Sequence, residues 1–378
     1  MRILHLADLH IGKVFHDVQM TDDQAYILDQ IIGIVKQEKV DLVAITGDVY
    51  DRLVPPVQAT VLMDDFLTRL IDSGVKVILT PGNHDSAQRL AFGGRLVRSC
   101  GLHIAPALPG AIMPVTLFDS HGEITFIPLP YIEPLLLRKS LDDPDIDSFD
   151  SALDAVMQSL PLCSGRTVCL AHCFTQGGVT SESERPLSIG GSSLVETGHF
   201  SRFNLTLLGH LHRPQKINET VFYAGSPLKY SFSESEHQKQ VAIYEVAADG
   251  TFSRECILLE PLRELRIIRG ELAALLAAAA SDPGRDDYLW VELTNRGALF
   301  DYAAEIRSCY PNVLNITRTA CQSGGSGERA IEIRTKNDRE IVASFFRHVT
   351  GEDLNPAEAG LMDELLTEMA TEQAGGAA

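Results

Sequence analysis

The sequence predicts an α/β fold in which parallel strands alternate with helices, and three observations support this prediction. First, the chain contains continuous apolar runs of the kind found in strands that are covered on both faces. These runs lie at residues 2–7, 41–46, 76–79, 167–171 and 205–208. Second, the segments between the first three runs carry apolar residues at helical spacing. Third, each run is followed within a few residues by Asp, Asn or His, as expected where strands deliver polar side chains to the carboxyl edge of a sheet.

The first hundred residues are therefore predicted to run strand, helix, strand, helix, strand. The apolar spacing predicts a first helix over about 22–38 and a second over about 57–73. Gly74 is expected to end the second helix as a C-cap. A further helical stretch is predicted from Asp85 to about Ser99.

The middle of the chain is predicted to build a second sheet. Residues 112–118 and 123–127 alternate as a β-hairpin does. Asp147 is expected to cap the helix that follows, because apolar residues recur on one face after it. Three later runs are expected to complete the second sheet; they lie at 221–224, 240–246 and 252–259.

The polar residues that follow the five runs form a candidate metal site. Imidazole, carboxylate and amide ligands together suit manganese, iron or zinc. Seven such side chains are too many for one ion, and two ions sharing a bridging carboxylate, about 3.5 to 4 Å apart, fit them better. The seven candidate ligands are Asp8, His10, Asp48, Asn83, His172, His210 and His212.

The order of these motifs resembles that of the calcineurin-like metallophosphoesterases. The matching segments are Asp8-Leu9-His10, Gly47-Asp48, Gly82-Asn83-His84-Asp85, His172 and Gly209-His210-Leu211-His212. The resemblance implies a four-layer α-β-β-α sandwich. Within that superfamily, residues 1–12, 47–52 and 225–227 resemble the SbcD family, bacterial nuclease subunits that act with an SbcC ATPase in the processing of DNA breaks and hairpins.

This resemblance also implies roles for individual residues. Asp8, His10, Asp48 and His212 would hold one ion, and Asp48, Asn83, His172 and His210 the other, with Asp48 bridging. The ions are expected to be Mn²⁺ and to activate a water molecule for attack on a phosphodiester. His84 would contact the phosphate or protonate the departing oxygen. Asp85 would either orient His84 or cap a helix, and its position is compatible with both.

Three regions are expected along the chain. Residues 1–260 would form the phosphoesterase domain, 261–336 a small α/β capping domain and 337–378 a helical segment with a tail. By the resemblance, the capping domain helps to position DNA, and the terminal helices bind the base of the SbcC coiled coil. Intramolecular packing is the alternative for those helices. The resemblance also implies a homodimer within a heterotetramer.

The composition and net charge of the chain limit the classes of protein to which it can belong. The 378 residues are 45% hydrophobic, enough for a large core. Because the chain shows neither a leader sequence nor an apolar run of about 18 residues, we expect a cytoplasmic protein without membrane contact. The seven cysteines are expected to be free thiols, with Cys169 and Cys173 buried beside His172. The net charge of −19 opposes nucleic-acid binding, which usually requires a basic surface.

Three functions remain open at this point. The first is an ATP-dependent double-strand exonuclease and single-strand or hairpin endonuclease, acting with an SbcC-type ATPase in DNA repair, replication and recombination. The alternative is a free-standing metallophosphoesterase that acts on small phosphoesters, which the acidic charge favours. The third, a binding subunit with a decayed metal centre, is opposed by the completeness of the seven ligands and His84.

Overall fold

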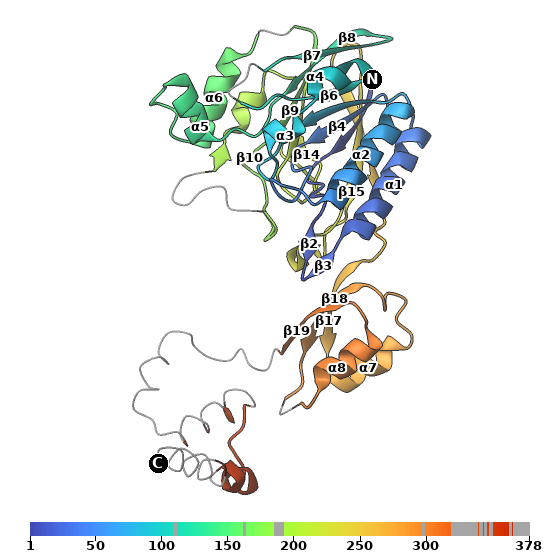
Figure 1. The fold of residues 1–378 in the computed structure, drawn as a ribbon, viewed down its shortest axis with the longest axis vertical. Coiled ribbons are helices and arrows are strands. Elements are labelled where there is room, and N and C mark those ends of the chain that lie inside the picture. The colour runs from blue at the N-terminus through green and yellow to red at the C-terminus, as the bar shows by residue number, and fades with distance from the viewer. Residues whose placement is uncertain are drawn as a thin grey trace. The chain divides into compact units, whose positions relative to one another are not determined.

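The computed structural model describes most of the chain and divides it into two compact units. It describes residues 1–318 except 109–111, 162–163, 185–192 and 297–298, and beyond them residues 339, 343, 346–347, 351–362 and 365. The first unit spans Met1–Leu262 and the second Arg263–Ala378. Each unit is described by itself below (Figure 1).

The first sheet of the first unit has six strands. Their order across the sheet is β16 (Phe252–Leu258), β15 (Gln240–Val246), β1 (Arg2–Leu6), β4 (Leu42–Thr46), β5 (Lys76–Thr80) and β6 (Leu102–Ile104). Strands β1, β4, β5 and β6 run parallel, whereas β15 runs antiparallel to β1 and to β16. The predicted parallel core of this sheet is confirmed.

The second sheet also has six strands. Their order is β13 (Gln215–Lys216), β14 (Val221–Tyr223), β12 (Leu205–Gly209), β9 (Arg166–His172), β8 (Gly122–Pro128) and β7 (Val115–Asp119). The prediction that all three late runs complete this sheet is wrong for two of them. Only β14 does so, whereas β15 pairs with β1 and thereby carries β16 into the first sheet. Apolar alternation shows that a segment is a strand but not which edge it pairs with.

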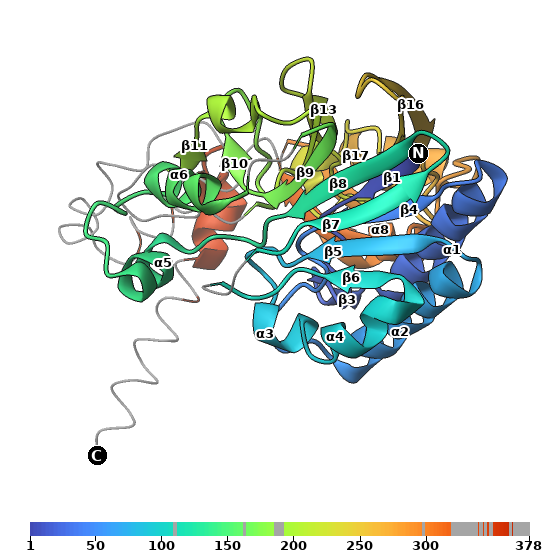
Figure 2. The ribbon, with the colours of Figure 1, turned by 90° about the horizontal axis from the view of Figure 1, so that it is seen from above.

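Helices cover the outer face of each sheet, so the first unit has four layers in the order α-β-β-α (Figure 2). Helices α1 (Thr21–Gln37) and α2 (Val57–Asp72) pack on the first sheet, and α5 (Pro134–Leu141) and α6 (Phe149–Ser159) on the second. The two sheets pack on each other through side chains such as Ile78, Phe126 and Leu207, all fully buried. The predicted α/β class and its four-layer arrangement are confirmed.

Two helical predictions need correction. The stretch after Asp85 is not one helix but α3 (Ala87–Leu90), α4 (Gly94–Val97) and the 3₁₀ turn η1 (Arg98–Cys100). Gly93 has φ +74° between α3 and α4, a left-handed conformation that a continuing helix cannot contain. The cap of α6 is Ser148 and not Asp147, because the Ser148 hydroxyl and Ser151 form a capping box.

Short elements complete the first unit. They are β2 (Val14–Phe15), β3 (Val18–Gln19), β10 (Phe174–Thr175), β11 (Leu194–Val195), η2 (Thr197–Phe200) and η3 (Phe232–Glu234). Cys169 is buried in β9, and burial raises the pKa of its thiol, as it does for Cys173. Cys169 is therefore buried as predicted, whereas Cys173 is only half-buried; both are free thiols. Among the described residues, no helix is long and apolar enough to cross a membrane.

In its described residues up to Arg318, the second unit contains a three-stranded parallel sheet with two helices. Its elements in order are β17 (Leu265–Gly270), α7 (Leu272–Ala279), β18 (Tyr288–Leu293), α8 (Tyr302–Cys309) and β19 (Val313–Arg318). Leu289, Val291 and Ile306 are fully buried between sheet and helices. Further on, Asn355 accepts hydrogen bonds from the backbone of Ala357 and Glu358, which is the geometry of a helix N-cap. Most of the helical segment predicted over 337–378 lies outside the described residues.

Candidate metal centre

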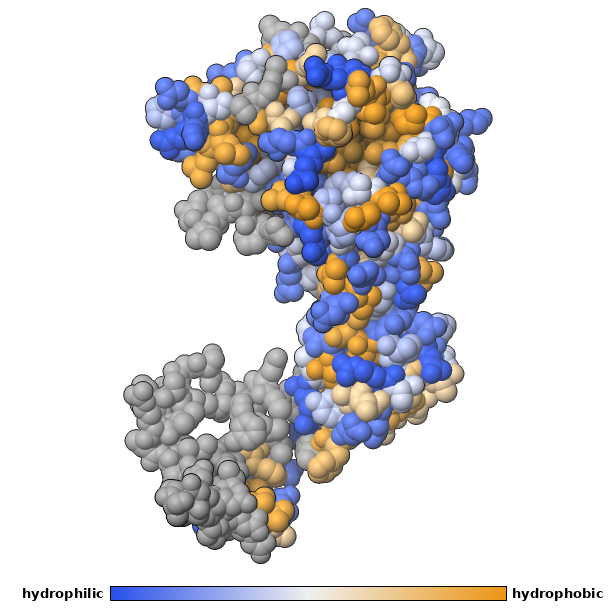
Figure 3. All heavy atoms as spheres, in the orientation of Figure 1, coloured by the Kyte–Doolittle hydropathy of each residue, from blue (hydrophilic) through white to orange (hydrophobic). Residues whose placement is uncertain are grey.

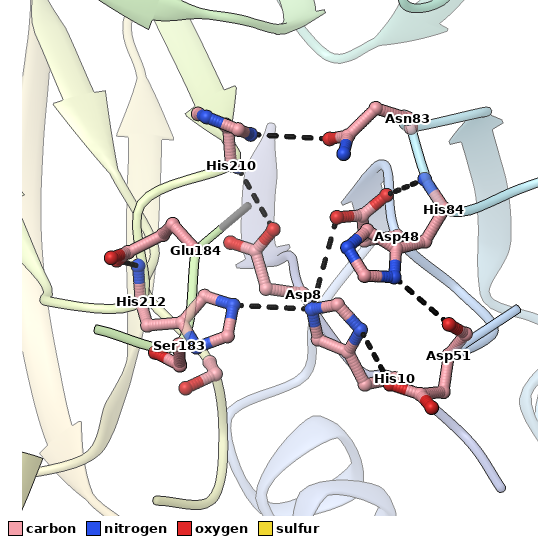
Figure 4. Close-up of polar contacts among 12 residues, drawn as sticks. Asp8, His10, Asp48, Asp51, Asn83, His84, Ser183, Glu184, His210 and His212 are labelled. Carbon is pink, nitrogen blue, oxygen red and sulfur yellow. Dashed lines mark hydrogen bonds and ion pairs between the residues drawn. The ribbon is translucent and has the colours of Figure 1, made fainter. Parts of the chain in front are cut away.

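The seven candidate ligands come together at the carboxyl ends of five strands. Asp8 and His10 follow β1, Asp48 follows β4, Asn83 follows β5, His172 ends β9, and His210 and His212 follow β12. Figure 4 shows the side chains from both sheets pointing toward one another. Asn83 is half-buried and the other six are buried, with exposed fractions of 4% or less. The convergence that the strand ends predicted is therefore present.

At this edge, four of the candidate ligands adopt a left-handed backbone conformation, which residues other than glycine usually avoid. Asp8, His10, Asp48 and His210 have φ values of 53°, 45°, 50° and 105°. A left-handed conformation costs free energy at a residue with a Cβ and persists where the surrounding structure imposes it, often at functional sites. Four such residues in one site indicate that the sharp turns serve to aim these side chains.

One group of ligand atoms is formed by Asp8, His10 and His212. The Nε2 atoms of His10 and His212 face each other at 3.1 Å. Asp8 Oδ2 is buried without a hydrogen-bond partner, although Asp8 Oδ1 accepts the backbone N–H of His210. An orphaned carboxylate oxygen beside two converging imidazole nitrogens is the donor set that a divalent cation satisfies.

A second group is formed by Asp48, His172 and His210. His172 Nε2 lies 3.4 Å from Asp48 Oδ2 and 2.9 Å from Asn83 Oδ1. His210 Nδ1 lies 3.2 Å from the same amide oxygen. Asp48 Oδ2 is also 3.7 Å from His10 Nε2, so its carboxylate lies between the two groups. This position suits the bridging role predicted for Asp48.

The electrostatics of the site favour a bound cation. Burial raises the pKa of the Asp8 carboxyl, and the neighbouring Asp48 raises it further. Burial and the nearby His172 lower the pKa of His210 to about 3. Burial also disfavours the charged form of His172, but the Asp48 carboxylate outweighs it and raises the pKa to about 9. His210 is therefore held neutral, as a metal ligand must be, whereas a bound cation would replace the protons that Asp8 and His172 otherwise hold.

His84 lies against this centre and is held by Asp51. Its Nδ1 donates a hydrogen bond of 2.8 Å to the Asp51 backbone carbonyl, and its ring packs edge-on against His10 at 4.6 Å. His10, Asp48 and His84 also place ligand atoms within 4.8 Å of one another. His84 is therefore near enough to act on a molecule bound at either group.

Both roles predicted for Asp85 need correction. Its carboxylate accepts the backbone N–H groups of Val49, Tyr50 and Gly82, at 3.0, 2.9 and 2.9 Å. The residue at the cap of α3 is Ser86. Asp85 thus joins the turns after β4 and β5, whereas the Asp51 carbonyl orients His84.

Two carboxylates behind His212 were not predicted from the sequence. Glu234 accepts a hydrogen bond from His212 Nδ1 at 3.2 Å, and Glu184 accepts the His212 backbone N–H at 2.8 Å. Glu184 belongs to the polar, Gly- and Ser-containing segment that follows β10 and carries no apolar periodicity. Glu234 lies in a Ser- and Glu-rich stretch with no periodic pattern, so no signal in the sequence separates it from a solvated surface residue.

Comparison with known protein families shows to which class of proteins the chain belongs. Residues 1–214 match the calcineurin-like phosphoesterase family, and the chain belongs to that family. It is therefore a hydrolase of phosphoester bonds, and its family implies divalent metal ions at this centre. Residues 261–350 match a second family, described as the type 5 capsule protein repressor C-terminal domain.

One known protein is similar to this chain over almost its entire length. The SbcD subunit of the SbcCD nuclease from Staphylococcus epidermidis is 29% identical over 372 residues, which cover 97% of this chain and 98% of that protein. Two solved structures are also similar. A dimetal phosphatase from Danio rerio aligns with a TM-score of 0.42, 12% identity and coverage of 69% of this chain and 98% of that one. The protein TT1561 of Thermus thermophilus aligns with a TM-score of 0.37, 12% identity and coverage of 68% and 98%.

Proposed function

We propose that this chain is the nuclease subunit of an SbcCD-type complex and hydrolyses DNA phosphodiester bonds with two divalent ions. The observation that carries the proposal is the convergence of all seven candidate ligands in a phosphoesterase whose resemblance to a nuclease subunit extends over both units. A relative that matched only residues 1–214 would support a phosphoesterase but not this choice of substrate.

In this proposal Asp8, His10, Asp48 and His212 hold one ion, and Asp48, Asn83, His172 and His210 the other. The ions, which we expect to be Mn²⁺, supply Lewis-acid stabilisation of the phosphoryl oxygens and a nucleophilic water at neutral pH. The buried, glycine-lined turns hold the ligands in place before substrate binds, so little reorganisation is needed during the reaction.

His84 assists the reaction as an acid. Because its Nδ1 donates to the Asp51 carbonyl, that nitrogen keeps its proton, and Nε2 is the atom that gains and releases one. A protonated Nε2 beside the scissile phosphate gives its proton to the departing oxygen as the P–O bond breaks, so that the oxygen leaves as a hydroxyl group and the imidazole becomes neutral.

The partners proposed are DNA, an SbcC-type ATPase bound through residues 337–378, and a second copy of this chain. An exposed apolar patch supports the dimer. Figure 3 shows hydrophobic residues gathered on the face that α2, α3 and α4 present in Figure 1. The patch consists of Leu53, Val54, Val57, Val61, Phe92 and Leu96, each between 58% and 89% exposed. A cluster of this kind is typical of an interaction surface.

One observation favours a second function, a free-standing phosphoesterase that acts on small phosphoesters. The net charge of −19 repels a polyanion, and the DNA contacts would then depend on the metal ions and on the partner.

Cleavage assays separate the two functions. The purified chain is incubated in Mn²⁺ with a labelled DNA hairpin and with a chromogenic phosphodiester, with and without its ATPase partner and ATP. Cleavage of the hairpin that the partner and ATP accelerate or redirect supports the nuclease. Hydrolysis of the small ester alone, unaffected by the partner, refutes it and supports the second function.

A further inference from the structure

The two candidate ion positions differ in what lies behind their imidazole ligands. The Nδ1 of His172 donates to a neutral group, the Thr46 backbone carbonyl, at 2.9 Å, and the nearest carboxylate oxygen recorded beside it, Asp8 Oδ1, is 4.0 Å away. The Nδ1 of His212 instead donates to a carboxylate, Glu234, which is fully buried. A carboxylate behind a ligating imidazole fixes its tautomer and makes its other nitrogen a stronger donor to a metal ion.

The Glu234 carboxylate is held in the interior by a buried lysine. Lys239 Nζ lies 2.5 Å from Glu234 Oε2 and also donates to Ser226 Oγ at 2.7 Å and to the His212 carbonyl at 2.8 Å. All three ammonium protons are thus used, and the opposite charges are paired.

The contacts around Glu234 converge on His212. The Nδ1–H of His212 is bound by Glu234, its backbone carbonyl by Lys239 and its backbone N–H by Glu184. The ring is left with Nε2 directed at His10. Ser183 also donates to Glu234 at 2.5 Å, so both carboxylate oxygens have partners. The network holds both the ring and the backbone of this one ligand.

His10, the other imidazole at the same position, has a similar but looser arrangement. Its Nδ1 lies 3.5 Å from Asp51 Oδ1, which accepts a 2.8 Å hydrogen bond from Lys13. A carboxylate paired with a lysine therefore stands behind each imidazole of this group. The pair behind His212 is the tighter and more deeply buried of the two.

We propose that Glu234, which is paired with Lys239, is a positioning residue for His212 and raises the affinity of the ion position formed by Asp8, His10 and His212. The inference rests on the proposed two-ion function. It adds that the two ion positions depend on different surrounding residues for their affinity. Glu234 contacts neither ion nor substrate and acts through His212.

Manganese binding to the full chain tests this inference, followed by calorimetric titration or by the electron paramagnetic resonance of free Mn²⁺. Glu234→Gln keeps an oxygen near Nδ1 but removes the negative charge. We expect the wild-type chain to bind two ions, and the variant to bind one of them about 10- to 100-fold more weakly while the other is unchanged. The matched control is Asp119→Asn, which neutralises another largely buried, ion-paired carboxylate, the partner of Arg166, and should leave both affinities unchanged.

A second variant is included because Glu234→Gln leaves the buried Lys239 without its anionic partner, which can unfold the chain. Glu234→Met with Lys239→Met removes both charges, a replacement that buried ion pairs often tolerate. It should fold and show the same selective loss of one ion. Cleavage by the folded variants should need more Mn²⁺ for half-maximal rate, with an unchanged KM for DNA at saturating Mn²⁺.

The possible outcomes distinguish a failure of the role proposed for Glu234 from a failure of the proposed function. Two ions bound with wild-type affinities by a folded variant would overturn the role of Glu234 and leave the proposed function standing. A wild-type chain that binds no Mn²⁺ would refute both proposals.

Discussion

Gly82 stands where the turn after β5 meets the candidate bridging ligand, and replacing it with alanine should disable the site. A Cβ at Gly82 would lie 2.2 Å from Asp48 Oδ1 and 2.3 Å from the Asp48 backbone nitrogen. Ordinary contacts begin at 3.4 Å, so one of the two turns must move by about 1 Å. A misplacement of about 1 Å can lower the rate about 100-fold. We expect at least that loss for Gly82→Ala, together with weaker binding of both ions, because Asp48 lies between both groups.

Cleavage of a DNA hairpin and Mn²⁺ titration measure the two effects. The matched control is Gly33→Ala, because a Cβ at Gly33, inside α1, would meet nothing within 4 Å. That variant should keep full activity and gain about 0.5 to 1 kcal/mol of stability, since alanine loses less conformational freedom in a helix than glycine does. If Gly82→Ala binds two ions and cleaves like the wild type, the turns are not rigidly coupled and the reasoning fails.

Three further predictions concern the acid, the metal and an ion pair far from the centre. His84→Ser should lower the rate of cleavage by about 10²- to 10⁴-fold while two Mn²⁺ ions still bind, and an unchanged rate would exclude His84 as the acid. Mn²⁺ at about 100 times its Kd should raise the free energy of unfolding by about 2.7 kcal/mol per site, whereas an unchanged Tm would mean that the folded centre does not bind it. Asp119→Asn should lower that free energy by about 3 kcal/mol at pH 7, because Asp119 pairs with buried Arg166 at 2.7 Å and with the N-terminal amine at 2.8 Å. These partners hold the pKa of Asp119 well below its usual range, so the stabilisation is complete above about pH 4 and is lost as the pH falls further. The difference between the two chains in urea unfolding should therefore shrink in acid, and a constant difference would show that the charge is not responsible.

Strand positions were predictable wherever a strand is covered on both faces. The runs that became β1, β4, β5, β9 and β12 consist of apolar residues because each lies between a helix layer and the other sheet. The pairing of β15 with β1 was not predictable, because an antiparallel edge pairing depends on contacts more than 200 residues apart in the chain. The break between α3 and α4 was missed because the apolar spacing continues across Gly93.

Within the site, the residues that end strands were predictable and the residues that support them were not. Strand ends gather at one edge of a sheet, so Asp8, Asp48 and His172 could be placed together from their positions alone. Asp85 was assigned the wrong partner because its three backbone donors come from two different turns. Glu234 was missed because it reaches His212 from a 3₁₀ turn that lies outside the motifs.

The sequence by itself determined the α/β class, the ends of the central strands and the identity of seven candidate ligands, because hydrophobic periodicity and strand-end polarity are local properties of the chain. Only the tertiary structure decided that Asp51 and not Asp85 holds His84, that Asp48 lies between two groups of donors, and that a buried Glu234–Lys239 pair stands behind His212. These are contacts between segments brought together by the packing of two sheets, and no local pattern records them.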